Sequence, residues 1–281
     1  MAGLKKSNSK DVERTIAQIE REDSAQLNSE VVTDEDGYVR NEPLLAGYVD
    51  EDSVLHDTFS YREMNGADEE AIAKSECRKN GAKLEAVLCS RCVDEIGTLK
   101  KKEFGTKWIN VIENMLGADV EYMAFKIREI SKGKEVTFKH QCPYCGEKIV
   151  TSIYTDDFNI IPFKGEREIP FTLPKPYKDK RGELHTDGVL RLPTVLDEEI
   201  VVPAMKKNPS AGKTLLLARL IKFDDGAVVT KDVVRNFTVS NRDYLEEIIN
   251  DNVFGIDIKM HIECPSCGEN IDGVAGESNF F

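Results

Sequence analysis

Two short cysteine sequences contain the residues of this chain that are best suited to metal or redox chemistry. They read CPYCG at residues 142–146 and CPSCG at residues 264–268, and together they supply four thiols. A Cys-x-x-Cys pair serves as a dithiol redox centre when a helix N-terminus lowers the pKa of its first thiol, or it forms half of a tetrahedral zinc site. The residues after Cys145, GEKIVT, suit a returning strand rather than a helix, which favours the zinc site.

Four thiolates are the ligand set of a closed structural zinc site. We therefore predict that the chain binds one structural Zn²⁺ ion through Cys142, Cys145, Cys264 and Cys267. A redox dithiol and buried cysteines without metal are the alternatives. Residues 146–263 separate the two pairs, whereas a compact zinc ribbon separates them by roughly 15 to 20 residues, so the prediction depends on how the chain is organised.

The sequence around the cysteine pairs indicates an internal duplication. CPYCGEKI (142–149) aligns with CPSCGENI (264–271), and the alignment continues upstream without a gap through Tyr122 and Tyr244. An earlier block, at a slightly different offset, pairs Tyr48, Asp50, Leu55, His56, Arg62 and Asp68 with Tyr177, Asp179, Leu184, His185, Arg191 and Asp197. Blocks in the same order predict two half-domains related by a pseudo-two-fold axis, each donating one cysteine knuckle to a shared metal.

Each copy has the same expected order of elements, which predicts the α+β fold class. The order is a hairpin, an acidic helix start, an apolar helix, an amphipathic helix and a short strand that leads into the cysteine turn. In the first copy, these elements are expected in turn at 47–64, from Asp68 onward, at 83–96, at 117–130 and at 136–141. In the second copy, they are expected at 170–193, from Asp197 onward, at 215–221, at 240–251 and at 256–263. Ser240 or Asn241 is the expected N-cap of the second amphipathic helix.

This pattern divides the chain into three segments. Residues 1–42 are polar, acidic and poor in aromatic side chains, so we expect a flexible tail there. Residues 43–158 and 159–281 are the first and second repeat units, and each contains a zinc knuckle near its end. The shared four-cysteine site, which is similar to a zinc ribbon, is expected to join the two units.

Two further motifs are expected to have structural roles. Cys89 and Cys92 form a third Cys-x-x-Cys, but Leu217 and Leu220 stand at the corresponding positions of the second copy, so we expect buried packing residues. Gly-Lys-Thr at 212–214 resembles the end of a phosphate-binding loop but lacks its leading glycine. Because no catalytic constellation is visible, we predict that the chain is not an enzyme and has no small-molecule substrate.

The four histidines are not required as metal ligands. His140 and His261 lie near the cysteine turns but do not occupy equivalent repeat positions, so supporting or surface roles are expected. His56 and His185 do correspond, and we expect them on the surfaces of the two hairpins.

The composition excludes several classes of function. The chain has 38 Lys and Arg against 51 Asp and Glu, and its formal charge of −13 repels phosphate, which argues against a nucleic-acid partner. No apolar run resembles a signal peptide or a membrane span, so we expect no membrane association. Seven cysteines in a reducing cytoplasm are better explained by metal binding or burial than by disulfides.

From LHDTFSYREMNGADEE (55–70) to CPYCGEKI, the chain resembles tailed-phage proteins of baseplate hub and tail assembly, in particular the T4-type baseplate hub assembly family. The resemblance covers most of residues 43–281. Its other motifs are the LCSRCVDEIG segment (88–97), the FTLP hairpin (171–174), the second knuckle and the aromatic end Asn279-Phe280-Phe281. The polar extension 1–42 is not part of the pattern.

This resemblance implies a non-enzymatic protein that binds other tail or baseplate proteins, as a baseplate hub component or as a chaperone-like assembly factor. It would act in the host cytoplasm during assembly and either leave or stay in the virion baseplate. Phe280 and Phe281 are candidates for partner binding, or they cover the protein's own core. The alternative function is a zinc-ribbon regulator that contacts nucleic acid or RNA polymerase. The few basic residues near the knuckles, Lys134, Lys139, Lys148 and Lys259, argue against it.

Overall fold

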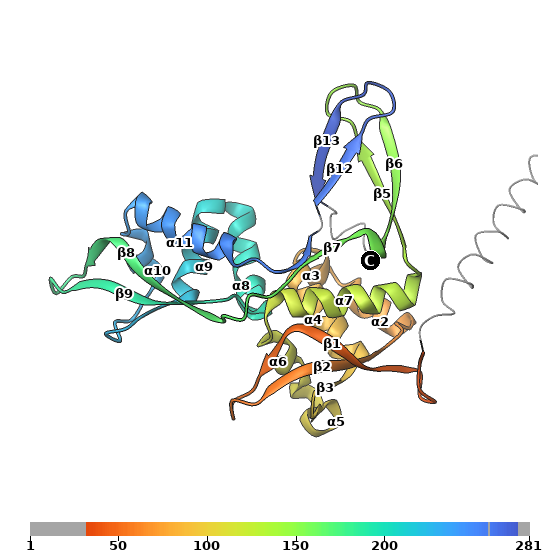
Figure 1. The fold of residues 1–281 in the computed structure, drawn as a ribbon, viewed down its shortest axis with the longest axis horizontal. Helices are drawn as coiled ribbons and strands as arrows, with labels where there is room; N and C mark the ends of the chain where they lie inside the picture. Colours follow the sequence, from red (N-terminus) through yellow and green to blue (C-terminus); the bar gives the residue numbers. More distant parts are fainter. Residues whose placement is uncertain (1–31, 258, 275–281) are drawn as a thin grey trace, which may run out of the picture.

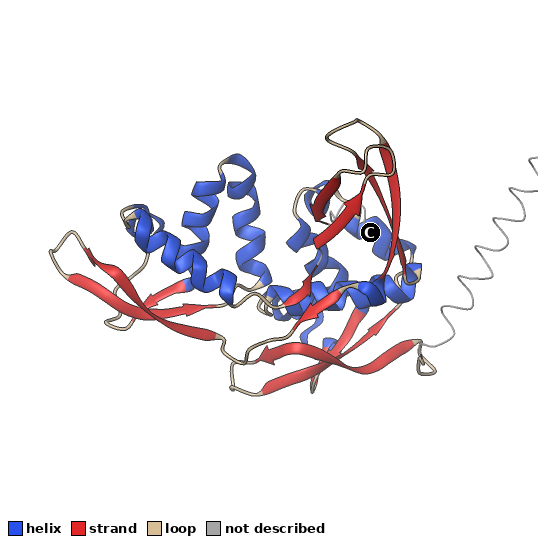
Figure 2. Cartoon of the chain, turned by 45° about the horizontal axis from the view of Figure 1, so that its top comes forward, coloured by secondary structure: helices blue, strands red, loops and turns tan. Residues whose placement is uncertain are grey.

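The structure is a computed structural model that describes residues 32–257 and 259–274. Two lobes of helices and strands lie side by side, and a narrow lobe of two β-ribbons projects from them (Figure 1). Within the two larger lobes, the helices gather on the same side of the long hairpins (Figure 2). The fold class is therefore α+β, as the sequence predicts.

The first lobe is built on a four-stranded antiparallel sheet in the order β1-β2-β3-β4. The strands are β1 (Tyr38–Val49), β2 (Leu55–Arg62), β3 (Val93–Ile96) and β4 (Leu99–Lys100). Its helices are α2 (Gly66–Ile72), α3 (Ser75–Arg78), α4 (Gly81–Cys92), α5 (Lys101–Phe104), the 3-10 turn η2 (Gly105–Lys107), α6 (Trp108–Glu113) and α7 (Gly117–Lys132). Because β1 begins at Tyr38, the folded part starts before the expected boundary at residue 43.

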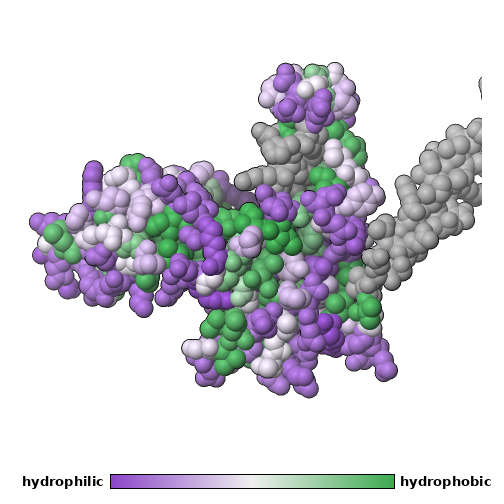
Figure 3. Space-filling view, viewed as in Figure 1, coloured by the Kyte–Doolittle hydropathy of each residue, from purple (hydrophilic) through white to green (hydrophobic). Residues whose placement is uncertain are grey.

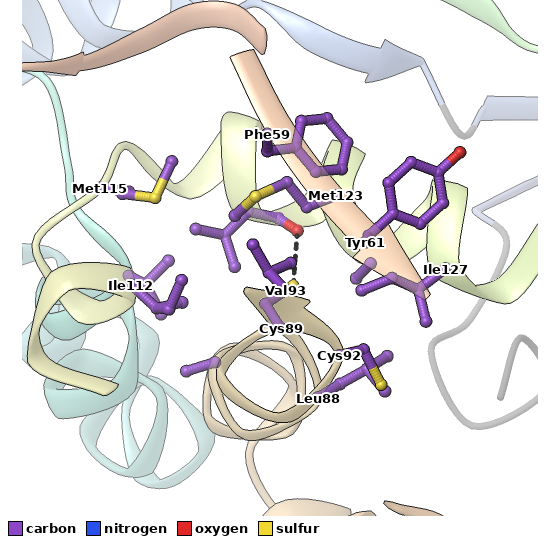
Figure 4. Close-up of a cluster of buried hydrophobic side chains, with 14 of the residues drawn as sticks. Phe59, Tyr61, Leu88, Cys89, Cys92, Val93, Ile112, Met115, Met123 and Ile127 are labelled. Carbon is purple, nitrogen blue, oxygen red and sulfur yellow. Dashed lines mark hydrogen bonds between the residues drawn. The ribbon is translucent and has the colours of Figure 1, made fainter. Parts of the chain in front are cut away.

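A large apolar core lies between this sheet and helices α4 and α7 (Figure 4). Phe59 and Tyr61 of β2 share one buried cluster with Leu88 of α4 and with Met123 and Ile127 of α7. Full burial of an aliphatic or aromatic side chain stabilises a fold by about 1.5 to 3 kcal/mol. This cluster therefore fixes how the hairpin and the two helices are arranged.

The second lobe contains a three-stranded sheet in the order β10-β9-β8. The strands are β8 (Glu168–Lys178), β9 (Leu184–Arg191) and β10 (Ile221–Phe223). The helices are α8 (Val195–Lys207), α9 (Pro209–Leu220), α10 (Lys231–Arg235) and α11 (Val239–Asp251). Its core is smaller and contains Phe171, Leu190, Leu217, Phe223 and Leu245.

The projecting lobe consists of two antiparallel ribbons from distant parts of the chain. The first ribbon pairs β5 (Glu135–Gln141) with β6 (Lys148–Tyr154), and the second pairs β12 (Lys259–Glu263) with β13 (Asn270–Val274). After β6, the 3-10 turn η3 (Thr155–Asp157) leads to β7 (Asn159–Ile161), which pairs with β11 (Gly255–Asp257). The β7–β11 pair therefore brings the two segments together where the ribbons begin.

Two expected element boundaries are wrong. The helix expected at 83–96 ends at Cys92, because Val93 turns to an extended conformation and the next residues pair with β2 as strand β3. The N-cap of α11 is Thr238 rather than Ser240 or Asn241, and its side chain accepts a hydrogen bond from the Asn241 N–H at 3.3 Å. In the first case the apolar periodicity continues past the residue at which the backbone becomes extended, and in the second the helix begins upstream of the expected cap.

Helix α2 begins at Gly66, and the acid expected at its start has a structural role. Asp68 is fully buried, and its carboxylate accepts hydrogen bonds from Arg62 of β2 and Arg91 of α4, both at 2.7 Å. It also accepts the N–H of the N-cap residue Asn65 at 3.0 Å. Burial alone would raise the pKa of Asp68, but Arg62, the Asn65 N–H and Arg91 lower it to about 2.

Asp197 makes the corresponding contacts in the second lobe. It is fully buried in the first turn of α8, and it accepts hydrogen bonds from Arg191 of β9 and Arg219 of α9. The N-cap residue Thr194 donates its N–H at 2.9 Å. Each buried aspartate thus ties a strand end, a helix start and a second helix together. Burial opposes ionisation, yet these partners lower the pKa of Asp197.

The two lobes are joined by backbone and side-chain contacts. The Val195 N–H donates to the Met115 carbonyl at 3.1 Å, and the Val195 side chain belongs to the core of the first lobe. Lys83 of α4 forms an ion pair with Glu199 of α8 at 2.6 Å. The start of α8 is therefore packed into the first lobe, and Figure 3 shows hydrophobic residues on the surface near this junction.

One residue at the start of each amphipathic helix holds the adjacent hairpin. Asn241 of α11 accepts the Lys175 N–H at 3.0 Å and donates to the Lys175 carbonyl at 2.8 Å. Asp119 of α7 accepts the N–H groups of Leu45 and Ala46 through Oδ1. Its Oδ2 is buried and has no hydrogen-bond partner among the described residues. Burial therefore raises the pKa of Asp119 to about 6, although the two N–H groups oppose the shift.

The buried aspartates predict a measurable loss of stability on neutralisation. Asp68→Asn or Asp197→Asn leaves two arginines without their shared carboxylate, so each variant should unfold about 3 kcal/mol more easily in urea titrations. Glu70→Gln, on an exposed residue of α2, is the matched control and should change stability by less than about 0.5 kcal/mol. A change below about 1 kcal/mol in both aspartate variants would contradict the assigned role.

The same residues predict acid sensitivity. Because the pKa of Asp68 is about 2 in the folded chain and about 3.9 in an unfolded chain, its contribution is complete above pH 4 and is lost as the pH falls towards 2. Asp197, with a lowered pKa, acts in the same direction. Unfolding free energies measured between pH 6 and pH 2 should therefore fall steeply below pH 4 in the parent chain and less steeply in Asp68→Asn.

Candidate metal centre

The two cysteine turns close the ends of the two ribbons with the same backbone hydrogen bonds. In the first turn, the Cys142 N–H donates to the Glu147 carbonyl at 2.8 Å, and the Gly146 N–H donates to the Cys142 carbonyl at 2.9 Å. In the second, Cys264 and Gly268 make the equivalent bonds, both at 2.9 Å. These hydrogen bonds close each turn, so the two cysteines of a turn lie on a hydrogen-bonded backbone.

Glycine is needed in these turns because of backbone conformation. Gly146 and Gly268 have φ angles of +77° and +72°, in the left-handed region that other residues rarely adopt. No atom lies within 4 Å of the position that a Cβ would take at either glycine, so space is not the reason. The Gly after each Cys-x-x-Cys is thus part of the turn, as the sequence indicates.

The structure brings the four sulfurs of Cys142, Cys145, Cys264 and Cys267 within 4.8 Å of one another. The Cys142 and Cys267 sulfurs are 3.7 Å apart, and those of Cys145 and Cys264 are 3.6 Å apart. A tetrahedral zinc site with Zn–S bonds of about 2.3 Å places its sulfurs about 3.8 Å apart, whereas a disulfide requires about 2.05 Å. The four cysteines therefore lie close enough to bind one metal ion, and the observed distances fit zinc.

The environment beneath the sulfurs is apolar. Cys142 and Cys264 are buried in a small cluster with Val136, Phe138 and Ile149, whereas Cys145 and Cys267 are exposed. Within the described part of the chain, the five buried residues of this cluster contribute little compared with the cost of ordering two ribbons. A metal ion bound by the four cysteines would supply an additional cross-link between the ribbons.

The four thiols cannot easily ionise together. Burial opposes ionisation of Cys142, but the N–H groups of Cys145 and Tyr144 and the neighbouring thiols lower its pKa to about 7. The Glu269 N–H favours the Cys267 thiolate, but desolvation and the three neighbouring thiols raise the pKa of Cys267 to about 12. A divalent cation would offset the repulsion among four thiolates, because metal binding replaces the protons.

The redox alternative lacks its structural requirement. β6, a strand, follows the first turn, so in the described part of the chain this turn does not open a helix whose N-terminus would stabilise a nucleophilic thiolate at Cys142. The second turn is likewise followed by a strand, β13. Both turns have the form of metal-binding knuckles.

The other cysteine pair lies elsewhere. Cys89 and Cys92 are completely buried in the core of the first lobe, and the Cys89 thiol donates to the Val120 carbonyl at 3.6 Å (Figure 4). Burial raises the pKa of Cys92 to about 12 and that of Cys89 well above its usual range. The expected packing role is confirmed. Gly-Lys-Thr at 212–214 lies within helix α9 and forms no phosphate loop.

The remaining candidate residues fall into two groups. The side chains of His140 and His261 and all of Phe280 and Phe281 lie outside the described residues. His185 is buried at the end of its hairpin instead of lying on the surface, as is His56. The sequence interpretation also gave no role to Glu147 and Glu269, whose carbonyls close the turns; the repeated Cys-Gly-Glu was the available signal.

Comparison with known proteins identifies a family. A family model described as "T4 bacteriophage base plate protein" matches residues 51–281. No curated protein and no solved structure shows a significant match to this chain. Among the described residues, no helix is long and apolar enough to cross a membrane.

The geometry predicts one tightly held metal ion per chain. Native mass spectrometry of protein dialysed against mild EDTA should show one ion in the parent chain and none in Cys142→Ser or Cys264→Ser, because either change opens the closed ligand set. Cys77→Ser, on a buried cysteine outside the cluster, is the matched control and should keep the ion. Retention of the ion in either ligand variant, or its absence from the parent chain, would refute a shared site.

Proposed function

The chain belongs to the T4 bacteriophage base plate protein family, and we propose that it is a non-enzymatic, zinc-stabilised protein that binds other tail proteins during baseplate assembly. The observation that carries this proposal is the family match over residues 51–281, which includes both cysteine pairs and the whole second lobe. A baseplate protein acts by holding partners in place, which requires a rigid scaffold and no catalytic site.

Zinc is the proposed metal, with Cys142, Cys145, Cys264 and Cys267 as its ligands. The sulfur separations of 3.6 and 3.7 Å support this choice, because they approach the edge of a zinc–thiolate tetrahedron. Zinc has no redox chemistry and serves as a cross-link. Its role would be to join the ribbon of residues 135–154 to the ribbon of residues 259–274.

We also propose that residues 43–158 and 159–281 are two copies of one unit, preceded by a tail. The matching Arg–Asp–Arg contacts of Asp68 and Asp197 support this interpretation, as do the identical hydrogen bonds of the two cysteine turns. Such repeated buried contacts are difficult to explain by chance similarity of short motifs. A shared zinc would then be bound by two cysteines from each copy.

The partners in this proposal are other phage tail or baseplate proteins, met in the host cytoplasm during assembly. The chain acts as a baseplate hub component that stays in the virion or as a chaperone that leaves. Phe280 and Phe281 are the proposed contact residues at the C-terminus. No membrane, nucleic-acid or small-molecule partner is part of the proposal.

A zinc-ribbon regulator that contacts nucleic acid or RNA polymerase is the rival function, because a four-cysteine site with two knuckles also occurs in that class. Charge argues against it. Residues 134–150 and 259–274 contain four lysines, together with five acidic residues, Glu135, Glu147, Glu263, Glu269 and Asp272. A nucleic-acid surface normally carries a basic excess. A gel shift that weakens steeply with salt would support the rival.

Genetic replacement in the phage tests the proposed function. Deletion of the gene should abolish complete baseplates, as counted by electron microscopy of tails from infected cells. Cys142→Ser and Cys264→Ser should each reduce them strongly, because the ribbons lose their cross-link. Cys77→Ser should have no effect. Mass spectrometry of purified virions then separates a retained component from a chaperone.

The outcomes separate the parts of the proposal. Normal baseplates after gene deletion would refute a role in assembly. Normal baseplates in both cysteine variants, with defective assembly after deletion, would refute only the requirement for zinc. Phe280→Ala combined with Phe281→Ala should weaken assembly without loss of the metal; unchanged assembly would remove these residues from the partner-binding surface.

A further inference from the structure

A second group of potential metal ligands lies at the tip of the β8–β9 hairpin, in a different part of the molecule from the four cysteines. One ligand atom from each of Asp179, Glu183 and His185 lies within 4.8 Å of the others. We propose that these three side chains bind a divalent transition-metal ion. The proposal is independent of the function proposed above, because it uses neither the cysteine site nor the family.

The imidazole of His185 is oriented for such a role. Its Nδ1 lies 2.6 Å from Asp225 Oδ2, and its Nε2 lies 3.8 Å from Asp179 Oδ2. The second distance is too long for a hydrogen bond but leaves room for an ion between the two atoms. A carboxylate that binds one imidazole nitrogen while the other faces a metal is the usual arrangement around metal-ligating histidines.

The ring of His185 is also fixed by packing. His185 is only 5% exposed, and its ring lies 6.0 Å from Tyr177 and 5.3 Å from Phe223, centroid to centroid. An imidazole held between two aromatic rings and a carboxylate has little freedom to turn away. Nε2 is therefore directed at the two acids of the hairpin tip.

Asp179 is oriented by the turn itself. Its Oδ1 accepts the N–H groups of Arg181 at 2.8 Å and Glu183 at 2.9 Å, so Oδ2 is left to face His185. The carboxylate of Glu183 is exposed and forms no hydrogen bond or ion pair in the described part of the chain. Two acids and one imidazole thus converge on one point, with two of the three side chains already positioned.

The first hairpin provides an internal comparison. There, His56 Nε2 bonds directly to Asp50 Oδ2 at 3.0 Å, which leaves no space for an ion. Val54 aligns with Glu183, so the third ligand is missing, and Thr98 rather than an acid lies beside Nδ1. The same hairpin frame therefore forms a closed ion pair in the first lobe and an open three-ligand group in the second.

The ligand set indicates the class of metal. Imidazole favours Zn²⁺, Ni²⁺, Cu²⁺ or Fe²⁺ over Ca²⁺ and Mg²⁺, which prefer oxygen alone. Three protein ligands leave a coordination position for water or for a side chain of another protein. The site should consequently exchange its ion more readily than the closed four-cysteine site, and mild EDTA should strip it.

Calorimetric titration with Zn²⁺ tests the site. The intact chain, first saturated at the cysteines and freed of loosely bound metal with EDTA, should take up one further equivalent of Zn²⁺ and none of Mg²⁺. Glu183→Val, which copies the first hairpin at an exposed position, should weaken this binding about tenfold or more. Asp225→Asn should weaken it about 10- to 100-fold through loss of the imidazole's orientation.

Glu51→Gln, at the exposed tip of the first hairpin, is the matched control and should leave the titration unchanged. Chemical shifts of the His185 imidazole nitrogens give an independent readout, since Zn²⁺ should move Nε2 of His185 and neither nitrogen of His56. Absence of a second equivalent would overturn the proposal, because His185 would then serve only as an ion-pair partner of Asp179 and Asp225. Equal binding in Glu183→Val and the parent chain would overturn it as well.

Discussion

The close approach of four cysteine thiols, which cannot easily ionise together, is the physical constraint on which the projecting lobe depends. The sulfurs of Cys142, Cys145, Cys264 and Cys267 lie within 4.8 Å of one another, and each turn is followed by a strand and not by a helix N-terminus that would stabilise a thiolate. Among the described residues, the two ribbons that carry them share a buried cluster of five side chains. A lobe so small can hold its shape through a cation that neutralises the thiolates and cross-links the ribbons.

The larger lobes are stabilised in a different way. Apolar cores hold each hairpin to its helices, and one buried aspartate in each lobe, Asp68 or Asp197, binds two arginines and a helix N-terminus. A buried ion pair adds little net stability compared with apolar packing, but loss of one member is costly. These contacts therefore determine where each helix begins relative to its hairpin. The Val195 N–H, at the start of α8, donates to the Met115 carbonyl and so joins the second lobe to the first.

Two larger lobes with apolar cores and a projecting lobe with four cysteines suit a member of a baseplate family. The packed lobes form the body of the molecule, and the ribbon lobe that carries the four cysteines projects from it (Figure 1). The tips of the two long hairpins extend in other directions, and a buried histidine in each lies beside an aspartate of the turn. Partner proteins would meet surfaces whose positions are fixed before binding, which lowers the entropic cost of assembly.

The sequence by itself determined the two cysteine turns and most of the elements, because Cys-x-x-Cys-Gly spacing and apolar periodicity are properties of neighbouring residues. It predicted both hairpins, the long amphipathic helices and the burial of Cys89 and Cys92. It did not predict that the acids Asp68 and Asp197 are buried between arginines, that the first apolar helix stops at Cys92, or that His185 faces Asp179 and Glu183. Only the tertiary structure decided these features, because burial and charge partners arise where segments distant in sequence meet.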